Sequence, residues 1–148
     1  MSYAVSNENY TISDDKSLLN INVIYDYLSK ESYWAKDIPL AIVEKSIDNS
    51  LCFGVYCNDV QIGFARLITD KATFAYLPDV FIVEQFRGKG LSKWLIETIH
   101  AHPELQTLRG WFLATRDAHE LYKKFGWQAL QNPARFMQKP TNIVYANL

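Results

Sequence analysis

The residues best suited to chemistry form a short glycine-containing segment, Gln85-Phe86-Arg87-Gly88-Lys89-Gly90. Its two glycines let the backbone turn tightly and come close to a ligand. The segment follows a long predicted strand and opens a predicted helix over 88–100, whose first N–H groups and dipole favour an anion. Arg87 and Lys89 add full positive charges beside those groups. We therefore predict a binding site for a pyrophosphate here.

Two common nucleotide-binding loops are excluded by the residues around this segment. The pattern GxxxxGK[ST] of a triphosphate-binding loop does not occur, and Lys93 stands where the dinucleotide fingerprint requires its third glycine. Leu108 and Arg109 occupy the region about 20 positions downstream where that fingerprint has an acidic residue. One alternative stays open from the loop alone: an ordinary strand-to-helix turn whose glycines serve geometry and whose cations serve solubility.

A second segment downstream, Ala118-His119-Glu120-Leu121-Tyr122-Lys123-Lys124-Phe125-Gly126-Trp127, gives the loop a specific context. The loop fully matches the motif [QR]-x-x-G-x-[GA], and the second segment looks like A-x-x-L-Y-x-x-x-G-[FW]. With both, the chain resembles the GNAT superfamily of acyl-CoA-dependent N-acyltransferases, by motif over about residues 60–130 and by element order throughout. The resemblance implies acetyl-CoA as co-substrate and a GNAT-like α/β fold, in which about four helices flank a central mixed sheet with splayed strands.

The resemblance also implies which residues hold acetyl-CoA. In similar proteins the strand before the loop splays from its neighbour and frees backbone groups for the pantetheine arm and the thioester carbonyl. We expect one N–H group of residues 81–83 to bind the oxyanion. Thr115 departs from the pattern, because many members carry asparagine there. The implied cofactor-binding residues are Phe81, Ile82, Val83, Gln85, Arg87, Gly88, Lys89, Gly90, Leu91, Ser92, Thr115, Asp117, Ala118 and Leu121.

Acyl transfer from a thioester to an amine needs an acid for the leaving thiolate and a base for the amine. Tyr122 occupies the usual acid position of the family, and its phenol has an ordinary pKa of about 10, close to that of a thiol. In similar enzymes an acidic residue in this region often receives the amine proton directly or through water, so Asp79, on the strand before the loop, is the predicted base. Each residue has an alternative: Tyr122 lies on an apolar helix face and could be a core tyrosine, whereas Asp79 could cap the strand near Pro78 or bind a cationic substrate.

The predicted acceptor site lies near a loop between two helices. In similar proteins this loop forms a wall of the acceptor site, so Tyr33 and Trp34 are candidate substrate-binding residues, although an aromatic pair there can also pack against the fold. No metal site is predicted, because His100, His102 and His119 lack neighbours in metal-binding spacing.

The leading functional hypothesis is an acetyltransferase that moves an acetyl group from acetyl-CoA to a primary amine of a small molecule, by direct attack in a ternary complex. One alternative is a protein or peptide amine as the acceptor. Another is a CoA-binding regulatory module without catalysis. A closed aromatic pocket near Trp34 would favour a small molecule, and a long open groove beside the thioester would favour a peptide.

Hydrophobic periodicity and turn residues predict the elements that position these side chains. Strands are expected over 10–12, 51–57, 60–68, 73–83, 107–114, 127–130 and 136–138. Helices are expected from a cap at Asp14 or Asp15 to residue 28, over 39–47 and 88–100, and from a cap at Asp117 to residue 125. Pro78 cannot donate a ladder hydrogen bond, which predicts an edge, a bulge or a splayed pair.

Length and composition indicate one domain, residues 1–148, with 49% hydrophobic residues and a formal net charge of -1. The near-neutral charge gives no general attraction to nucleic acid or to an anionic membrane surface, and no run of about 18 apolar residues exists. We expect a cytoplasmic monomer or homodimer that binds neither. Cys52 and Cys57 point to opposite faces of one predicted strand, so free thiols are expected.

Overall fold

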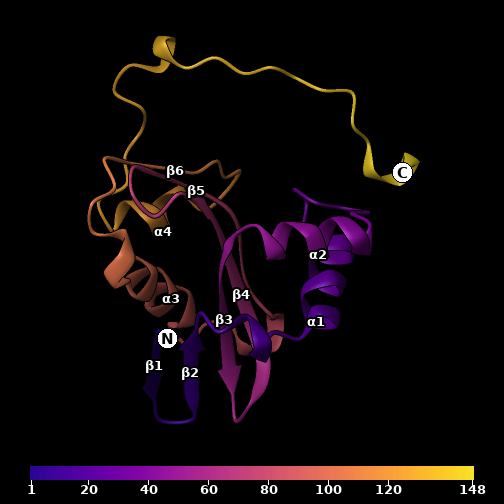
Figure 1. The fold of residues 1–148 in the computed structure, drawn as a ribbon, viewed down its shortest axis with the longest axis vertical. Helices are drawn as coiled ribbons and strands as arrows, with labels where there is room; N and C mark the ends of the chain where they lie inside the picture. The colour runs from indigo at the N-terminus through magenta and orange to yellow at the C-terminus, as the bar shows by residue number, and fades with distance from the viewer.

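A computed structural model describes residues 1–148 and shows one six-stranded sheet (Figure 1). The strands lie in chain order; each pairs antiparallel with the next, except for the last pair, which is parallel. They are β1 (Ala4–Asn7), β2 (Tyr10–Ser13), β3 (Leu51–Cys57), β4 (Val60–Thr69), β5 (Phe74–Ile82) and β6 (Gly110–Phe112). The mixed α/β architecture is confirmed, and the unpredicted β1 extends the sheet by a hairpin strand.

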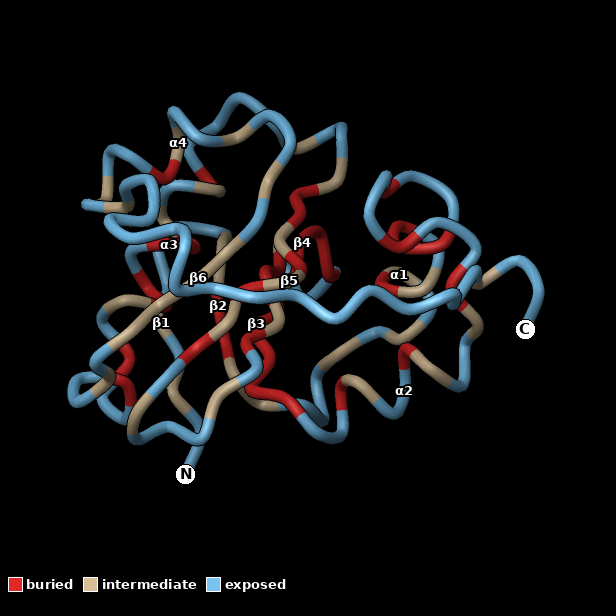
Figure 2. The backbone as a smooth tube through the Cα atoms, turned by 90° about the horizontal axis from the view of Figure 1, so that it is seen from above, coloured by how far each residue is buried: buried red, intermediate tan, exposed pale blue.

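Helices cover both faces of this sheet (Figures 1 and 2). α1 (Ile21–Asp26), continued by a π-helical segment over Tyr27–Glu31, and α2 (Leu40–Asp48) lie on one side. α3 (Leu91–His100) and α4 (His119–Lys123) lie on the other. Short 3-10 turns cover Lys16–Leu18, Glu84–Phe86, Pro103–Leu105, Pro133–Arg135 and Tyr145–Asn147.

Two apolar clusters result, one beneath each pair of helices. Neighbouring strand residues alternate between them: Cys52 and Phe64 belong to the cluster of α1 and α2, whereas Phe53 and Ala65 belong to the cluster of α3. This alternation follows from the two-residue period of a strand. Because both faces of β3 and β4 are buried, their sequences are almost continuously apolar rather than alternating.

The first helical segment is shorter than the sequence predicts. Asp15 caps only the turn Lys16–Leu18, and Asn20 then caps α1 by accepting two first-turn N–H groups at 3.0 and 3.4 Å. The backbone N–H of Asn20 donates to Oε1 of Gln61 at 2.6 Å, which ties the break to β4. The helix therefore begins later because a distant strand and a second capping residue interrupt it.

The two closing strands predicted over 127–130 and 136–138 are absent. Both stretches contain apolar residues, but a strand needs a partner edge, and none within the chain pairs with them. The prediction is therefore wrong for these residues.

The predicted irregularity at Pro78 is confirmed. The register of β4 and β5 shifts between the pairs Arg66–Asp79 and Ile68–Tyr76, so that Pro78 lies in a β-bulge. On its other side β5 pairs with β6 only over Phe74–Tyr76 and then continues alone to Ile82. This early end of the β5–β6 ladder opens a wedge in the sheet.

Both cysteines are free thiols, as predicted. Burial raises the pKa of Cys52 to about 11, so its thiol stays protonated at neutral pH. No helix has both the length and the apolar character needed to cross a membrane.

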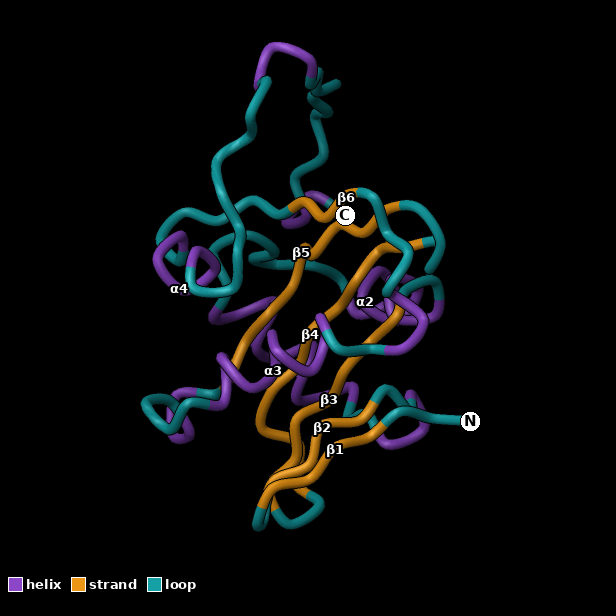
Figure 3. Tube along the Cα trace, turned by 90° about the vertical axis from the view of Figure 1, so that its left-hand side faces the viewer, coloured by secondary structure: helices purple, strands orange, loops and turns teal.

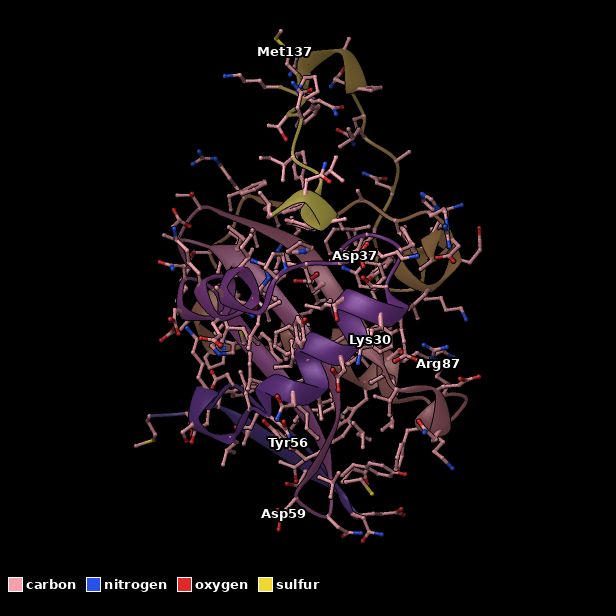
Figure 4. The ribbon with its side chains drawn as sticks, turned by 90° about the vertical axis from the view of Figure 1, so that its right-hand side faces the viewer. Lys30, Asp37, Tyr56, Asp59, Arg87 and Met137 are labelled. Carbon is pink, nitrogen blue, oxygen red and sulfur yellow. The ribbon has the colours of Figure 1, made fainter.

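Tyr56 carries a buried hydroxyl that has no hydrogen-bond partner. Its ring lies over Gly54, where any Cβ would overlap the phenol (Figure 4 labels Tyr56). Burial raises the pKa of Tyr56 to about 12, because the charged form would lose hydration.

Tyr56→Phe should raise the free energy of unfolding by about 1 kcal/mol, because it removes a buried polar group that folding desolvates without compensation. Chemical denaturation would measure the change. Tyr10→Phe, at a half-buried tyrosine on the neighbouring strand, is the control and should change little. A loss of stability in Tyr56→Phe would contradict the assignment of an unpaired hydroxyl.

Candidate active site

The loop before α3 leaves its two glycines open to a ligand. Gly88 and Gly90 have φ angles of 78° and 79°, in the left-handed region that favours glycine. A Cβ built at either position would meet nothing within 4 Å. The turn therefore requires glycine for its backbone angle, and the space beside it is free for a ligand.

Six consecutive backbone N–H groups, those of residues 88–93, have no acceptor in the chain. The last three belong to the first turn of α3, whose N–H groups lack intrahelical partners. Gly90 caps the helix without a side-chain oxygen that would compete for these donors. Free amides at the positive end of a helix dipole favour an anion, and the pyrophosphate site expected here stays a prediction.

Arg87 folds back onto the body of the protein rather than standing free beside the loop. Its Nε donates to the backbone oxygen of Ile82 at 3.0 Å, and one Nη donates to the hydroxyl of Tyr27 at 2.7 Å. The Tyr27 ring stacks on Phe81 with 3.9 Å between centroids. Arg87, labelled in Figure 4, thus fixes the loop to β5 and to the segment after α1.

The hydrogen-bond pattern of β5 decides which of its amides face the wedge. The N–H of Val83 donates to the backbone oxygen of Ile62 at 2.9 Å, so Val83 is directed toward β4. Residues of an antiparallel strand alternate in this direction, which turns the amides of Ile82 and Val80 toward the wedge and that of Phe81 toward β4. Of the three predicted oxyanion donors, only Ile82 has the required direction.

Two cavities meet at the loop. The smaller, about 190 Å³, lies against the glycines and the start of α3; the larger, about 810 Å³, fills the wedge between β5, the segment after α1 and the loop before α4. They share Ile82, Arg87, Ser92 and Leu121, so they form one continuous path.

Most of the predicted cofactor-binding residues lie along this path. Val83, Gln85 and Lys89 line neither cavity. The predicted residues that do are Phe81, Ile82, Arg87, Gly88, Gly90, Leu91, Ser92, Thr115, Asp117, Ala118 and Leu121.

Tyr122 lines the larger cavity from α4 and is only 8% exposed. Desolvation raises the pKa of Tyr122 to about 12, and the nearby Tyr33 phenol adds a smaller effect in the same direction. No protein group bonds its hydroxyl, which is not fully enclosed. A neutral phenol with a free O–H is therefore available to a ligand in this cavity.

The start of α4 differs from the sequence prediction. Asp117 does not cap the helix; the hydroxyl of Thr115 instead accepts the backbone N–H groups of Asp117 at 3.4 Å and of Ala118 at 3.1 Å. The helix begins at His119, and Gly126, with φ of 90°, ends this region as predicted. Thr115 thus orders the turn that carries Tyr122.

Asp79 lies between the two walls of the larger cavity and is 4% exposed. Its Oδ1 accepts the indole N–H of Trp34 at 2.7 Å, and its Oδ2 accepts Nε of Arg66 at 2.6 Å. Arg66 in turn donates to the Ser50 hydroxyl at 3.1 Å. The carboxylate therefore orients Trp34 and neutralises a nearly buried arginine, and its role as a base stays a prediction.

Tyr33 connects the two walls of the larger cavity. Its hydroxyl accepts the backbone N–H of Arg116 at 2.8 Å, and the Arg116 guanidinium lies 3.9 Å from the ring centroid. The ring also packs edge-on against Trp34, with 5.1 Å between centroids. The predicted pair thus connects the segment after α1 to the loop before α4 and lines the same cavity as Tyr122.

Some residues of the site carry no signal in the sequence. Tyr145, near the C-terminus, lines the larger cavity and packs against the cluster of α1 and α2. In the sequence Tyr27 is one more apolar position of a predicted helix, yet its hydroxyl accepts a hydrogen bond from Arg87. Ile42 also lines the larger cavity. Its helical spacing predicts a buried position but does not tell whether the side chain faces the cavity or the core.

Known proteins are similar to this chain in sequence and in fold. Residues 48–129 match the family described as acetyltransferase (GNAT) domain. A candidate acetyltransferase of Gibberella zeae is 30% identical in an alignment 140 positions long, and the alignment covers 78% of this chain and 76% of that protein. The crystal structure of a candidate GNAT-family acetyltransferase from Xanthomonas campestris is 47% identical, with a TM-score of 0.89 over 93% of this chain and 96% of that one. The chain belongs to the GNAT acetyltransferase family.

More distant GNAT structures share the fold. A GNAT family acetyltransferase from Elizabethkingia anophelis with acetyl-CoA bound has a TM-score of 0.64 at 15% identity, over 84% of this chain and 80% of that one. At that identity the likeness extends to the fold alone. The predicted GNAT membership and central mixed sheet are thus confirmed, and the residues of this GNAT chain that bind acetyl-CoA stay a prediction.

Gly88→Ala and Gly90→Ala should each weaken CoA binding by about tenfold or more, because a methyl group would stand between the free amides and a phosphate, and losing one charge-assisted hydrogen bond has an effect of that size. Calorimetry would measure the affinity. Gly126→Ala is a matched control in this GNAT chain, since Gly126 also has a positive φ and open space around it. All three variants should lose similar stability, about 1 kcal/mol. Equal loss of CoA affinity in Gly126→Ala would contradict the assignment.

Asp79→Asn tests whether Asp79 acts as the base or only positions Trp34. We expect KM for the acceptor to rise while the midpoint of the pH profile stays unchanged, because both carboxylate oxygens are already engaged. Trp34→Phe, which keeps the Arg66 ion pair, should reproduce the KM change. A pH profile altered by Asp79→Asn but not by Trp34→Phe would instead identify Asp79 as the base. Thermal unfolding must accompany both, because removing one partner of a buried ion pair costs about 3 kcal/mol or more.

Proposed function

We propose that this GNAT chain transfers an acetyl group from acetyl-CoA to a primary amine of a small molecule, by direct attack in a ternary complex. One observation carries the proposal: the path that begins at the six free amides leads into the cavity that contains both Tyr122 and the aromatic pair Tyr33 and Trp34. Bound acetyl-CoA would supply the reactive thioester. The remaining chemistry belongs to the residues of the chain.

The loop residues suit the cofactor end of the site. Amides 88–93 offer donors for a pyrophosphate, and Lys89 is an exposed cation on the same loop. The wedge-facing N–H groups of Val80 and Ile82 are the candidate donors for the pantetheine arm and for the oxygen that becomes negative during acyl transfer. They are fixed by the sheet, so they need no reorganisation during the reaction.

Tyr122 suits the role of the acid. Its raised pKa keeps the phenol protonated over the whole working range, so it can donate a proton to a departing thiolate. An amine acceptor must itself be deprotonated to attack. Activity should therefore rise with pH until the acceptor amine is neutral, and it should not fall through ionisation of Tyr122 until pH approaches about 12.

The acceptor side favours a small molecule over a peptide. Tyr33 joins the segment after α1 to the loop before α4 by its bond to Arg116, and Tyr145 from the C-terminal stretch lines the same cavity. A volume of about 810 Å³ suits a metabolite with the acyl end of the cofactor. The Trp34 ring also suits the ammonium form in which an amine arrives, since Arg116 already lies over the ring of Tyr33.

The test is release of free CoA from acetyl-CoA with a panel of small amines and with peptides of free N-terminus or lysine. Turnover with a small amine at a higher kcat/KM than with any peptide is expected. Turnover confined to peptides would favour the protein-modifying alternative. Saturable CoA binding without transfer to any amine would favour a regulatory module.

Tyr122→Phe should lower kcat with a true acceptor by about 100-fold, because the leaving thiolate loses its proton donor, whereas KM for acetyl-CoA should change little. The rising limb of the pH profile should keep its midpoint, since that limb reports the acceptor amine. Steady-state assays across pH 6–10 would measure both, with Tyr76→Phe, another tyrosine of the cavity lining, as the control. Unchanged kcat in Tyr122→Phe would contradict the acid role.

A further inference from the structure

Three arginines line the larger cavity, and two of them are already bonded to other side chains. Arg66 forms its ion pair with Asp79, and Arg87 donates to the hydroxyl of Tyr27. Arg116, in the loop before α4, forms no ion pair, and only its backbone N–H donates a hydrogen bond. The donors of its guanidinium are therefore available to a ligand that enters the cavity.

Tyr33 holds Arg116 at two points. The Tyr33 hydroxyl accepts the backbone N–H of Arg116 at 2.8 Å, and the guanidinium carbon lies 3.9 Å from the centre of the Tyr33 ring. Tyr33 itself packs edge-on against Trp34, whose indole N–H is bonded to Asp79. The contact with the ring orients the guanidinium without giving its N–H groups an acceptor. The cation is thus positioned, and its hydrogen-bonding capacity is unused.

Arg116 and Trp34 belong to opposite walls of the larger cavity. Figures 1 and 3 show α4 and α2 on opposite sides of β5. The loop before α4 carries Arg116, and the segment between α1 and α2 carries Trp34. The ring of Tyr33 contacts both, with 5.1 Å between its centroid and that of Trp34, and the two rings are 42% and 37% exposed. A small molecule can therefore touch the indole and the guanidinium at the same time.

The charges around Arg116 favour a ligand group with one negative charge. Glu31 and Asp117 line the same cavity as exposed carboxylates, and neither forms an ion pair. They would repel a dianion such as a phosphate monoester, but they favour an amine that arrives as a cation. A guanidinium binds a carboxylate through two parallel N–H···O bonds and balances its single charge.

We propose that the acceptor is a small amine that also carries a carboxylate, such as a free amino acid, and that Arg116 binds this carboxylate while the amine lies at Trp34. The inference rests on the proposed acetyl transfer and narrows its substrate class. The carboxylate only anchors the acceptor. The amine nitrogen bonds to the acetyl carbon and loses a proton, while the C–S bond breaks and the thiolate gains one. Arg116 therefore sets specificity and takes no part in the transfer itself.

Matched acceptors test the proposal on the full-length protein. Amino acids are compared with their carboxamides and with the amines left after removal of the carboxylate, by release of free CoA from acetyl-CoA. Each kcat/KM is divided by the fraction of neutral amine, because the three kinds of amine differ in pKa. The acids should be better acceptors by about tenfold or more, the effect of one charge-assisted pair. Equal use of all three kinds would overturn this inference and leave the acetyl transfer intact, whereas no turnover with any small amine would overturn both.

Arg116→Gln supplies the second measurement. It should lower kcat/KM for the acids by about tenfold, mainly through KM, and should leave the carboxamides unchanged. Arg116→Lys should recover only part of the loss, because a lysine keeps the charge but not the two parallel donors. Arg109→Gln is the matched control, since Arg109 is an exposed arginine outside the larger cavity whose side chain has no partner. An equal loss with acids and carboxamides, or a loss of CoA affinity by calorimetry in Arg116→Gln, would overturn the assignment of Arg116 to the acceptor.

Discussion

The early end of the ladder between β5 and β6 is the constraint on which the rest of the structure depends. Three residues of each strand are paired, and the outer side of β5 beyond Tyr76 then has no neighbouring strand. The bulge at Pro78 increases the local twist of β5 at the point where the partner strand departs. Backbone groups that would otherwise be satisfied within the sheet thus face a cavity, where a ligand can take the place of a strand.

The buried carboxylate of Asp79 stabilises the arrangement of the elements around this wedge. It accepts hydrogen bonds from two different elements, the loop that carries Trp34 and the strand that carries Arg66. A charge pair with so little exposure is stable only when both partners are present and well hydrogen-bonded. Asp79 and its ion pair therefore tie the position of Trp34 to the register of β4 and β5.

Features set by local residues could be predicted from the sequence. Gly88 and Gly90 predict the tight turn of the loop, and the spacing of apolar residues predicts α3. Pro78 predicts the irregularity that the structure shows as a bulge. Features set by distant partners could not. The break before α1 depends on Gln61, and the fold-back of Arg87 depends on Tyr27.

The same distinction explains the errors at the end of the chain. Residues 127–130 and 136–138 have the composition of strands, but composition does not tell whether they pair with an edge of the sheet, and the outer edge of β6 has no partner. Tyr145 could not be assigned to the site, because nothing in its neighbourhood indicates that the chain returns across the cavity. Among the predicted cofactor residues, the sequence also could not separate Ile82 from Phe81 and Val83, since the direction of an amide depends on register.

The two walls of the cavity come from separate stretches of chain, and this has a consequence for how new acceptors could arise. The segment from Tyr27 to α2 meets the half that carries the loop and α4 through three side chains, Tyr27, Tyr33 and Trp34, each by one hydrogen bond. A foreign segment grafted between β2 and β3 would need to preserve those three contacts and the apolar packing of this segment on Phe64 and Phe81. The fold thus lets one wall of the cavity change while the glycine loop and α4 stay as they are.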